Sequence, residues 1–236
     1  MLIALISDVH ANLPAFDAVL REIDSIKPDY VLCLGDVVGY GPQPNEVIQI
    51  LRDRKIPSVM GNHDAAIAGF YSLRSFREPN HSVLSLTREL ITDENKEWLK
   101  SLPMTISGEN WIAAHATPLV KEEWPYLNSA LKCMDLLNQT SEDFCFIGHT
   151  HRPGVISNQF GILKVQKGYR FVINPGAVGQ SRDSDKRACF CTINTKTFEH
   201  QLHRKSYEFG DTLSMYPSFG IERETGKKLL HLDREF

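Results

Sequence analysis

The sequence predicts an α/β protein, from the alternation of short apolar runs with amphipathic segments. Continuous apolar runs such as Leu2–Ile6 and Tyr30–Leu34 are typical of strands that are covered on both faces. Segments with helical spacing of apolar residues follow each of them, from Leu13 to Ile23 and roughly from Asn45 to Arg54. Residues after 154 instead show the alternation that is typical of antiparallel strands, most clearly at Ala188–Asn194.

The remaining elements are expected in chain order. Ile56–Met60 is interpreted as a buried strand, and residues 65–102 show helical spacing without a strand signal, with a cap signal at Thr92. The sequence from Gly210 is polar with weak periodicity and predicts at most a helical turn at Lys227–Leu232. Further strands are expected at Trp111–Ala114, Phe144–Ile147, Gly154–Ile156, Leu163–Gln166, Arg170–Ile173 and Phe198–Leu202, with a helix at about Asn128–Asn138.

Length and composition suit one soluble domain. The chain has 236 residues, 42% of them hydrophobic and 23% charged, so we expect a single domain over 1–236 with a helical insert at about 65–102. The net charge of -3 gives no basic excess, which makes duplex nucleic acid an unlikely partner. The five cysteines lack Cys-x-x-Cys spacing, and no leader or membrane-spanning run is visible, so a reduced, cytoplasmic protein is expected. A homo-oligomer remains open.

Metal-type side chains follow five of the predicted strands. Residues two apart on an extended segment point the same way, so Asp8 and His10 can bind one ion together, as can His149 and His151. In open α/β sheets, ligands bind beyond the carboxyl ends of the strands, where these groups would converge. Carboxylate, imidazole and amide ligands suit Mn²⁺, Fe, Zn²⁺ or Ni²⁺ better than Ca²⁺ or Mg²⁺. The full set is Asp8, His10, Asp36, Asn62, His63, His115, His149 and His151.

The run Gly61-Asn62-His63-Asp64 adds groups that a catalytic site needs. The Asn62 amide oxygen can bind a hard divalent cation, and His63 can give a proton to a leaving oxygen. Asp64 can hold the imidazole in one tautomer and orientation. Taken alone, the run could equally be a polar loop with a surface histidine, but five such elements in this order are improbable by chance.

The ordered set Asp8-x-His10, Gly35-Asp36, Gly61-Asn62-His63-Asp64, His115-Ala116 and Gly148-His149-x-His151 resembles the calcineurin-like metallophosphoesterase superfamily. Two loops, residues 35–42 and 174–179, are similar to its small single-domain bacterial branch, which includes YfcE-like phosphodiesterases. The resemblance covers about residues 1 to 205. It implies a four-layer αββα sandwich, in which two mixed β-sheets are flanked by helices.

The resemblance also implies a two-ion site with Asp36 as the bridging ligand. A metal-bridging hydroxide would then attack phosphorus in line, and His63 would protonate the leaving alkoxide, with Asp64 behind it. Position by position, the resemblance assigns one ion to Asp8, His10, Asp36 and His151, and the other to Asp36, Asn62, His115 and His149.

The sequence departs from the protein phosphatases of the superfamily at three places. These enzymes carry an arginine in the loop after the bridging aspartate, where this chain has Gly39-Tyr40-Gly41, and Asp64 and Ala116 replace their usual Glu and Gly. Phosphoprotein phosphatase activity is therefore not expected, and the cation that binds phosphate must come from elsewhere. Arg182 is the candidate, with Asn62 as a second substrate-binding residue, although Arg182 could also be a solvated loop arginine.

The expected activity is that of a phosphodiesterase acting on a small phosphorylated substrate or a nucleotide. A phosphomonoesterase, a nuclease, a nucleotide pyrophosphatase and a non-catalytic binding scaffold are the alternatives. The nuclease and pyrophosphatase alternatives depend on a possible aromatic-basic groove formed by Tyr71, Arg74, Phe76 and Arg77, which could instead be a packed helix face with solvated arginines.

Overall fold

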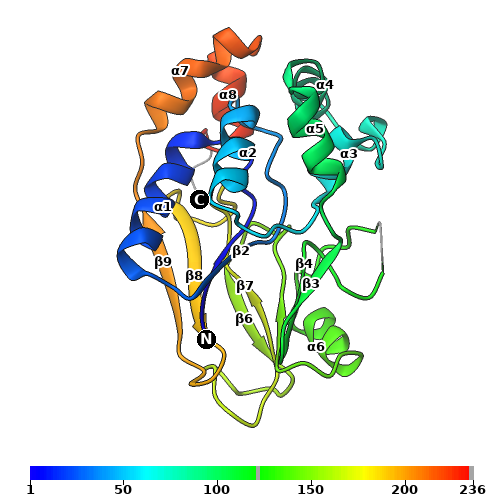
Figure 1. Cartoon of the computed structure of the whole chain (residues 1–236), viewed down its shortest axis with the longest axis vertical. Helices are drawn as coiled ribbons and strands as arrows, with labels where there is room; N and C mark the ends of the chain where they lie inside the picture. The colour runs from blue at the N-terminus through cyan, green and yellow to red at the C-terminus, as the bar shows by residue number, and fades with distance from the viewer. Residues whose placement is uncertain (121–122, 234–236) are drawn as a thin grey trace.

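The structure, a computed structural model, describes residues 1–120 and 123–233, whose strands form two sheets (Figure 1). One sheet has the strand order β2-β1-β8-β9 and the other β3-β4-β5-β7-β6. The strands are β1 (Leu2–Ile6), β2 (Tyr30–Cys33), β3 (Thr105–Ser107), β4 (Trp111–Ala114), β5 (Phe144–Phe146), β6 (Gly154–Ser157), β7 (Phe171–Asn174), β8 (Ala188–Asn194) and β9 (His200–Lys205).

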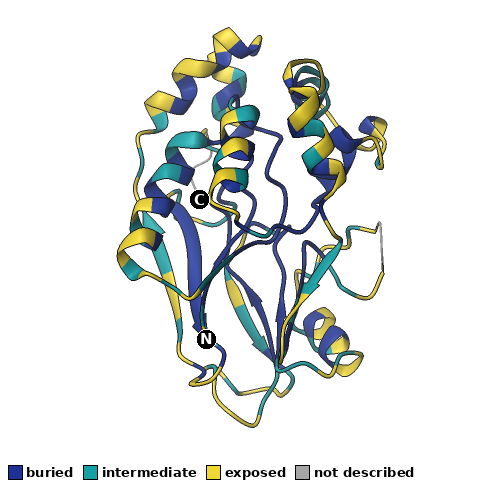
Figure 2. Cartoon of the chain, viewed as in Figure 1, coloured by how far each residue is buried: buried dark blue, intermediate teal, exposed yellow. Residues whose placement is uncertain are grey.

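Strand β1 lies inside its sheet and is buried on both faces, as its continuous apolar run predicts. It pairs parallel to β2 and antiparallel to β8. Ile3 and Leu5 face the second sheet, whereas Ala4 and Ile6 belong to the core beneath helices α1 (Leu13–Ile26) and α2 (Pro44–Asp53). In Figure 2, β1 is largely dark blue because most of its residues are buried, whereas the helices have a dark blue buried face and a yellow exposed face.

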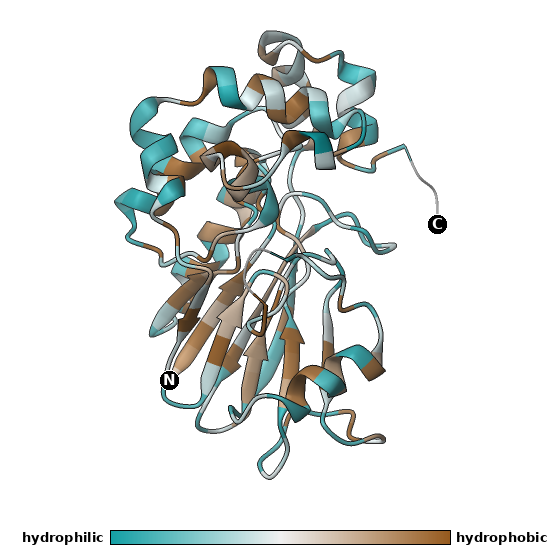
Figure 3. Ribbon diagram, turned by 90° about the vertical axis from the view of Figure 1, so that its right-hand side faces the viewer, coloured by the Kyte–Doolittle hydropathy of each residue, from teal (hydrophilic) through white to brown (hydrophobic). Residues whose placement is uncertain are grey.

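The second sheet is also covered on both faces. Phe144 and Phe146 of β5 pack toward the first sheet, in one cluster with Ile3 and Leu5. On the opposite face, helix α6 (Ala130–Asn138) packs Leu137 and its neighbours against Cys145 and Val172. The layers are therefore helix, sheet, sheet and helix, which confirms the predicted αββα sandwich. Figure 3 shows brown, apolar stretches along several strands and teal polar residues on the helices.

The segment predicted to be helical contains helices α3, α4 and α5 and one short 3₁₀ turn. Thr92 caps α5, since its hydroxyl accepts a hydrogen bond from the Asn95 N–H at 3.2 Å, as the cap signal predicted. The bounds are α3 (Asn62–Ala68), η1 (Leu73–Ser75), α4 (Asn80–Leu90) and α5 (Asp93–Lys100). That the whole of 1–236 is one domain stays a prediction, and residues 121–122 and 234–236 lie outside the described residues.

Two of the predicted strands are wrong. Ile56–Met60 makes only a single parallel bridge, between Cys33 and Ser58, because Pro57 has no N–H to give and the chain then turns so that Met60 donates to the Pro103 carbonyl. Leu163–Gln166 forms no strand, and Leu163 is 90% exposed, because no neighbouring strand covers this run.

The C-terminal segment is more ordered than the sequence predicts. Helices α7 (Phe209–Phe219) and α8 (Arg223–Leu229) bury Leu213, Tyr216 and Phe219 against Leu229, and Tyr216 donates a hydrogen bond to the Tyr40 carbonyl at 3.0 Å. The apolar period is interrupted by Pro217 and Gly220 within and just after α7, which hides it in the sequence.

The five cysteines are free and buried, as predicted from their spacing. Burial raises the pKa of Cys33 and of Cys189 to about 12, so these thiols remain protonated near neutral pH. Within the described residues, none of the helices is long and apolar enough to cross a membrane.

Candidate metal site

The chain leaves the strands in left-handed turns, and these turns aim the candidate ligands at one another. The prediction that Asp8 and His10, and likewise His149 and His151, lie on extended segments is wrong. The φ angles of Asp8, His10, Asp36, His149 and His151 are 53°, 50°, 51°, 65° and 57°. Such angles are costly for residues other than glycine and persist where surrounding contacts impose them. Here the Asp8 N–H donates to the Gly35 carbonyl and the His10 N–H to the Asp36 carbonyl, both at 3.0 Å.

Four imidazole rings are each fixed by a backbone carbonyl. The nitrogen that faces a carbonyl must carry the proton, so in the neutral ring the other nitrogen presents a lone pair. The pairs are His10 Nδ1 with Val38 O (2.9 Å), His115 Nδ1 with Leu34 O (2.7 Å), His151 Nδ1 with Gln180 O (2.7 Å) and His149 Nε2 with Trp124 O (3.1 Å).

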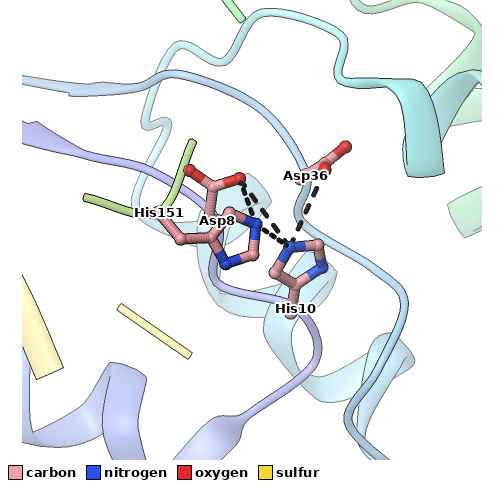
Figure 4. Close-up of side chains that lie close together, drawn as sticks. All are labelled: Asp8, His10, Asp36 and His151. Atoms are coloured by element: carbon pink, nitrogen blue, oxygen red, sulfur yellow. Dashed lines mark hydrogen bonds and ion pairs between the residues drawn. The ribbon is translucent and has the colours of Figure 1, made fainter. Parts of the chain in front are cut away.

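The four remaining nitrogens face each other in two pairs. His10 Nε2 and His151 Nε2 lie 3.1 Å apart, and His115 Nε2 and His149 Nδ1 lie 3.2 Å apart. Two lone pairs this close repel unless a proton or a cation lies between them. Figure 4 shows the first pair beside the carboxylates of Asp8 and Asp36.

Each of the two carboxylates has one oxygen fixed by donors and one directed at the imidazoles. Asp8 Oδ2 accepts from the Ser7 hydroxyl at 2.7 Å, whereas Oδ1 is buried, 3.2 Å from His151 Nε2. Asp36 Oδ1 accepts the His63 N–H at 2.9 Å, at the start of α3. Asp36 Oδ2 lies 3.2 Å from His115 Nε2 and 3.7 Å from His10 Nε2, so this oxygen reaches both histidine pairs.

Asn62 also has a buried acceptor oxygen. Its Oδ1 and Asp8 Oδ1 are buried and accept no hydrogen bond within the described parts of the chain. Buried acceptors without a donor are costly, and a cation would satisfy them. Two groups, Asp8, His10, Asp36 and His151, and Asp36, His115 and His149, each place their ligand atoms within 4.8 Å of one another. The donor chemistry fits divalent cations, with Asp36 common to both groups.

The pKa values of His10 and His149 favour the neutral ring that metal binding requires. Burial lowers the pKa of His10 well below its ordinary value, and burial with the nearby His115 lowers that of His149 to about 3. Burial acts in the same direction on His115, but the Asp36 carboxylate outweighs it and raises the pKa of His115 to about 9. In the metal-free protein, His115 therefore carries a proton near neutral pH. A cation that binds His115 must displace this proton.

His63 lies beside the two groups of candidate ligands and packs among aromatic side chains. Its Nε2 lies 4.0 Å from Asp36 Oδ2, and its ring packs against Tyr40 and Phe76 at centroid distances of 4.9 and 4.8 Å. Gly39, at φ 91°, approaches so closely that a Cβ there would lie 2.1 Å from His63 Nδ1. Burial lowers the pKa of His63 to about 4, so the ring is neutral near pH 7.

Asp64 does not hold the His63 ring. Its Oδ1 accepts from the N–H groups of Val37 (2.9 Å) and Val38 (3.2 Å), and its Oδ2 from that of Gly61 (3.0 Å). His63 Nδ1 has no hydrogen-bond partner in the described residues. Asp64 occupies the third position of α3, where a carboxylate caps the helix and here also ties it to the loop after β2. Burial raises the pKa of Asp64 to about 7, against the effect of these donors.

A cavity of about 330 Å³ opens beside the ligand groups, and both predicted substrate-binding residues, Asn62 and Arg182, line it. Among the described residues, the Arg182 guanidinium donates to neutral groups: Gln180 Oε1 at 3.2 Å, the Tyr126 hydroxyl at 3.4 Å and the Tyr40 hydroxyl at 2.9 Å. Its positive charge therefore remains available to an anion in the cavity.

The aromatic and basic side chains of residues 71–77 divide at this cavity. Tyr71, Phe76 and Arg77 line it, whereas Arg74 is exposed and does not. Tyr71 and Phe76 also pack against the core, and Arg74 and Arg77 are exposed, as the alternative of a packed face with solvated arginines expects, although the segment is a short 3₁₀ turn.

Sequence reasoning missed the residues before α6. The Trp124 carbonyl accepts from His149 Nε2, and its ring packs against His115 at 5.8 Å. Tyr126 stacks on His149 at 4.2 Å with an angle of 22° between the rings. The signal was a Trp-Pro-Tyr run just before a predicted helix, which by itself predicts only a turn.

Residues 1–197 match the model of the calcineurin-like phosphoesterase superfamily domain. An uncharacterised protein of Methanocaldococcus jannaschii is 37% identical over 217 residues, which cover 88% of each chain. The chain therefore belongs to the calcineurin-like phosphoesterase superfamily, and this membership makes it a phosphoester hydrolase. Enzymes of this kind use divalent metal ions, in agreement with the ligand groups described above.

The chain is also similar to two further proteins. A metallophosphoesterase from Sphaerobacter thermophilus is 33% identical, with a TM-score of 0.83 over 97% of this chain and 98% of its own. The symmetrical bis(5'-nucleosyl)-tetraphosphatase of Pectobacterium atrosepticum is 29% identical over 133 residues, 55% of this chain. The matched part spans about half of that enzyme, 47% of its length.

Proposed function

We propose that this protein is a dinuclear metal-dependent phosphoesterase in which Asp36 bridges the ions. The observation that carries the proposal is the convergence of four inward imidazole nitrogens on two carboxylates, with each outward nitrogen held by a backbone carbonyl. In the proposed assignment, Asp8, His10, Asp36 and His151 hold one ion, and Asp36, Asn62, His115 and His149 hold the other. Nitrogen and oxygen ligands without sulfur favour Mn²⁺, Fe, Zn²⁺ or Ni²⁺.

When bound, such a pair of ions supplies an acidified water and neutralises charge in an in-line displacement at phosphorus. Side chains of the protein supply the proton transfer and the binding of phosphate. In this proposal His63 gives a proton to the leaving oxygen from its protonated, imidazolium form. Burial lowers the pKa of the ring to about 4, so a bound anionic phosphate beside the ring must raise that pKa before His63 can act as the acid. Tyr40 and Phe76 fix the orientation of its ring. Arg182 binds a non-bridging phosphate oxygen, since no carboxylate in the described residues neutralises it.

The substrate in this proposal is a phosphodiester with a nucleotide part. Tyr71, Phe76, Trp124 and Tyr126 line the cavity and offer aromatic surfaces on which a base can stack. A second candidate is a nucleotide pyrophosphatase, favoured by the likeness to enzymes named symmetrical bis(5'-nucleosyl)-tetraphosphatase. The cytoplasmic location and a homo-oligomeric state stay predictions.

The proposal is tested on protein stripped of metal and reloaded with Mn²⁺. Turnover of a chromogenic phosphodiester, the matching monoester and a dinucleoside tetraphosphate is compared, with a chelator control. Diester turnover well above monoester turnover, abolished by chelator, is the expected result. A preference for the monoester would contradict the diester assignment, and turnover that resists complete metal removal would contradict the metal mechanism.

A further inference from the structure

A second cavity, of about 530 Å³, adjoins the one at the ligand groups. Arg182 and Tyr126 line both cavities, so these two side chains form the boundary between them. The second cavity, here called the α6 cavity, lies between the start of α6 and the strands β6 and β7. It is lined, among others, by Asn128, Ser129, Thr150, Arg152, Ile156 and Asn174. A substrate bound at the ligand groups can therefore extend past Arg182 into a defined space.

The charged side chains that line the α6 cavity are positive. Its lining includes two arginines, Arg152 and Arg182, and no aspartate or glutamate in the described residues. The chain as a whole has the opposite balance, with 29 acidic and 26 basic residues. Unpaired guanidinium groups around a cavity bind phosphate oxygens through charge-assisted hydrogen bonds.

In the part of the chain that the structure describes, neither arginine is paired with a carboxylate. Arg182 donates there to an amide oxygen and two phenol oxygens. Arg152 is exposed, and within the described chain it makes hydrogen bonds only through its backbone, with Thr150 Oγ1. Two other arginines differ in this respect. Arg187, five residues after Arg182, is paired with Asp185, and Arg204 of β9 is paired with Asp183. Arg152 and Arg182 therefore bring to one cavity two guanidinium groups without a carboxylate partner among the described residues.

Polar groups that can complete an anion site surround Arg152. Thr150 carries a hydroxyl on the loop that also carries His149 and His151, and Asn128 is exposed at the cavity wall. Beneath them, Ile147 and Val172 provide an apolar floor that could carry the sugar and base of a nucleotide. The cavity therefore combines a cationic rim with an apolar floor.

We propose that the α6 cavity binds a second phosphate, and the nucleoside attached to it, on one side of the cleaved bond, with Arg152 as the specificity-determining residue. The inference deepens the proposed function, on which it rests, and selects nucleoside oligophosphates over simple diesters as the substrate class. Arg182 at the boundary then contacts the phosphate that reacts, and Arg152 contacts the next phosphate along the chain.

The test compares Arg152→Gln with Arg74→Gln, which removes the same charge from an exposed residue outside both cavities. Both variants are loaded with Mn²⁺ and assayed on a dinucleoside tetraphosphate and on a chromogenic diester. We expect Arg152→Gln to raise KM for the tetraphosphate about tenfold more than KM for the diester, the factor typical of one charge-assisted hydrogen bond. The Arg74→Gln variant should show no such difference. Equal changes for both substrates with Arg152→Gln would overturn the proposal.

A binding measurement separates this inference from the proposed catalytic function. Titration calorimetry of the Mn²⁺-loaded protein compares adenosine 5'-diphosphate with adenosine 5'-monophosphate. Arg152→Gln should weaken binding of the diphosphate about tenfold relative to the monophosphate. This result would support the subsite even if no diester were turned over. An unchanged preference for the diphosphate would overturn the subsite even if catalysis were normal.

Discussion

The ligand groups and the walls of the substrate cavity are constructed in opposite ways. His10, His115 and His151 are almost fully buried, and each ring has one nitrogen fixed by a backbone carbonyl. The walls of the cavity also include exposed side chains from loops, such as Tyr126 at 45% exposure. The difference indicates that chemistry is set by a rigid cluster, whereas specificity resides in a surface that can change without loss of the cluster.

Removal of Asp36 should have the largest effect. Asp36→Ala takes away the oxygen that faces both histidine pairs and the acceptor for the His63 N–H. We expect both ions to be lost and turnover to fall by at least about 10³-fold, because metal activation and charge neutralisation fail together. Elemental analysis and turnover of a chromogenic diester check this, and retention of two ions per chain would refute the bridging role.

His63→Ala should separate catalysis from metal binding. His63 lies beside the ligand groups but outside the two clusters, so the variant should keep its metal content. Loss of a general acid typically costs about 10²–10⁴-fold in turnover number. If the variant folds, as judged by circular dichroism, and retains wild-type turnover, the proton-donor role is wrong.

Arg182→Gln should have a smaller effect, because it changes a wall of the cavity. The variant keeps a side chain that can bond the Tyr40 hydroxyl but loses the charge. One charge-assisted hydrogen bond to phosphate corresponds to about 10–100-fold in kcat/KM. Arg182→Lys is the matched control and should recover part of the loss. No change in either variant would make Arg182 a structural residue only.

Asp64→Asn should affect stability more than turnover. The change preserves one acceptor oxygen but weakens the three backbone hydrogen bonds that the carboxylate accepts. We expect the free energy of unfolding to fall by about 1–3 kcal/mol, with turnover number nearly unchanged. Urea denaturation and steady-state kinetics measure both. A fall in turnover of about 10⁴-fold, as when the orienting carboxylate of a catalytic histidine is lost, would restore the catalytic role predicted from the sequence.

Local patterns in the sequence predict the strands and the ligand cluster, whereas the four-layer arrangement was implied by the resemblance to the superfamily. Apolar runs such as Leu2–Ile6 identify strands buried on both faces, and each run ends at chemically distinctive residues. The joint order of these ends carries the prediction, although the assumed geometry was wrong. Asp8 and His10 converge through left-handed turns, which are held by backbone contacts with distant segments, including the loop after β2.

Features that depend on distant contacts could not be predicted. Asp64 looked like a partner for its neighbour His63, but its Oδ1 accepts hydrogen bonds from Val37 and Val38 in the loop after β2, 27 and 26 residues away. Trp124 and Tyr126 reach the site because the segment after β4 folds over His149. The C-terminal helices are specified by packing of Tyr216 against Tyr40, and no local period indicates this contact.

The central claim is that two cations share Asp36, and anomalous diffraction from crystals of the Mn²⁺-loaded protein tests it most directly. The account predicts two peaks about 3.5–4 Å apart, a typical spacing for a two-metal site. Both peaks should contact Asp36, one also near His10 and His151 and the other near His115 and His149. A single peak, or two peaks of which one does not contact Asp36, would contradict the account.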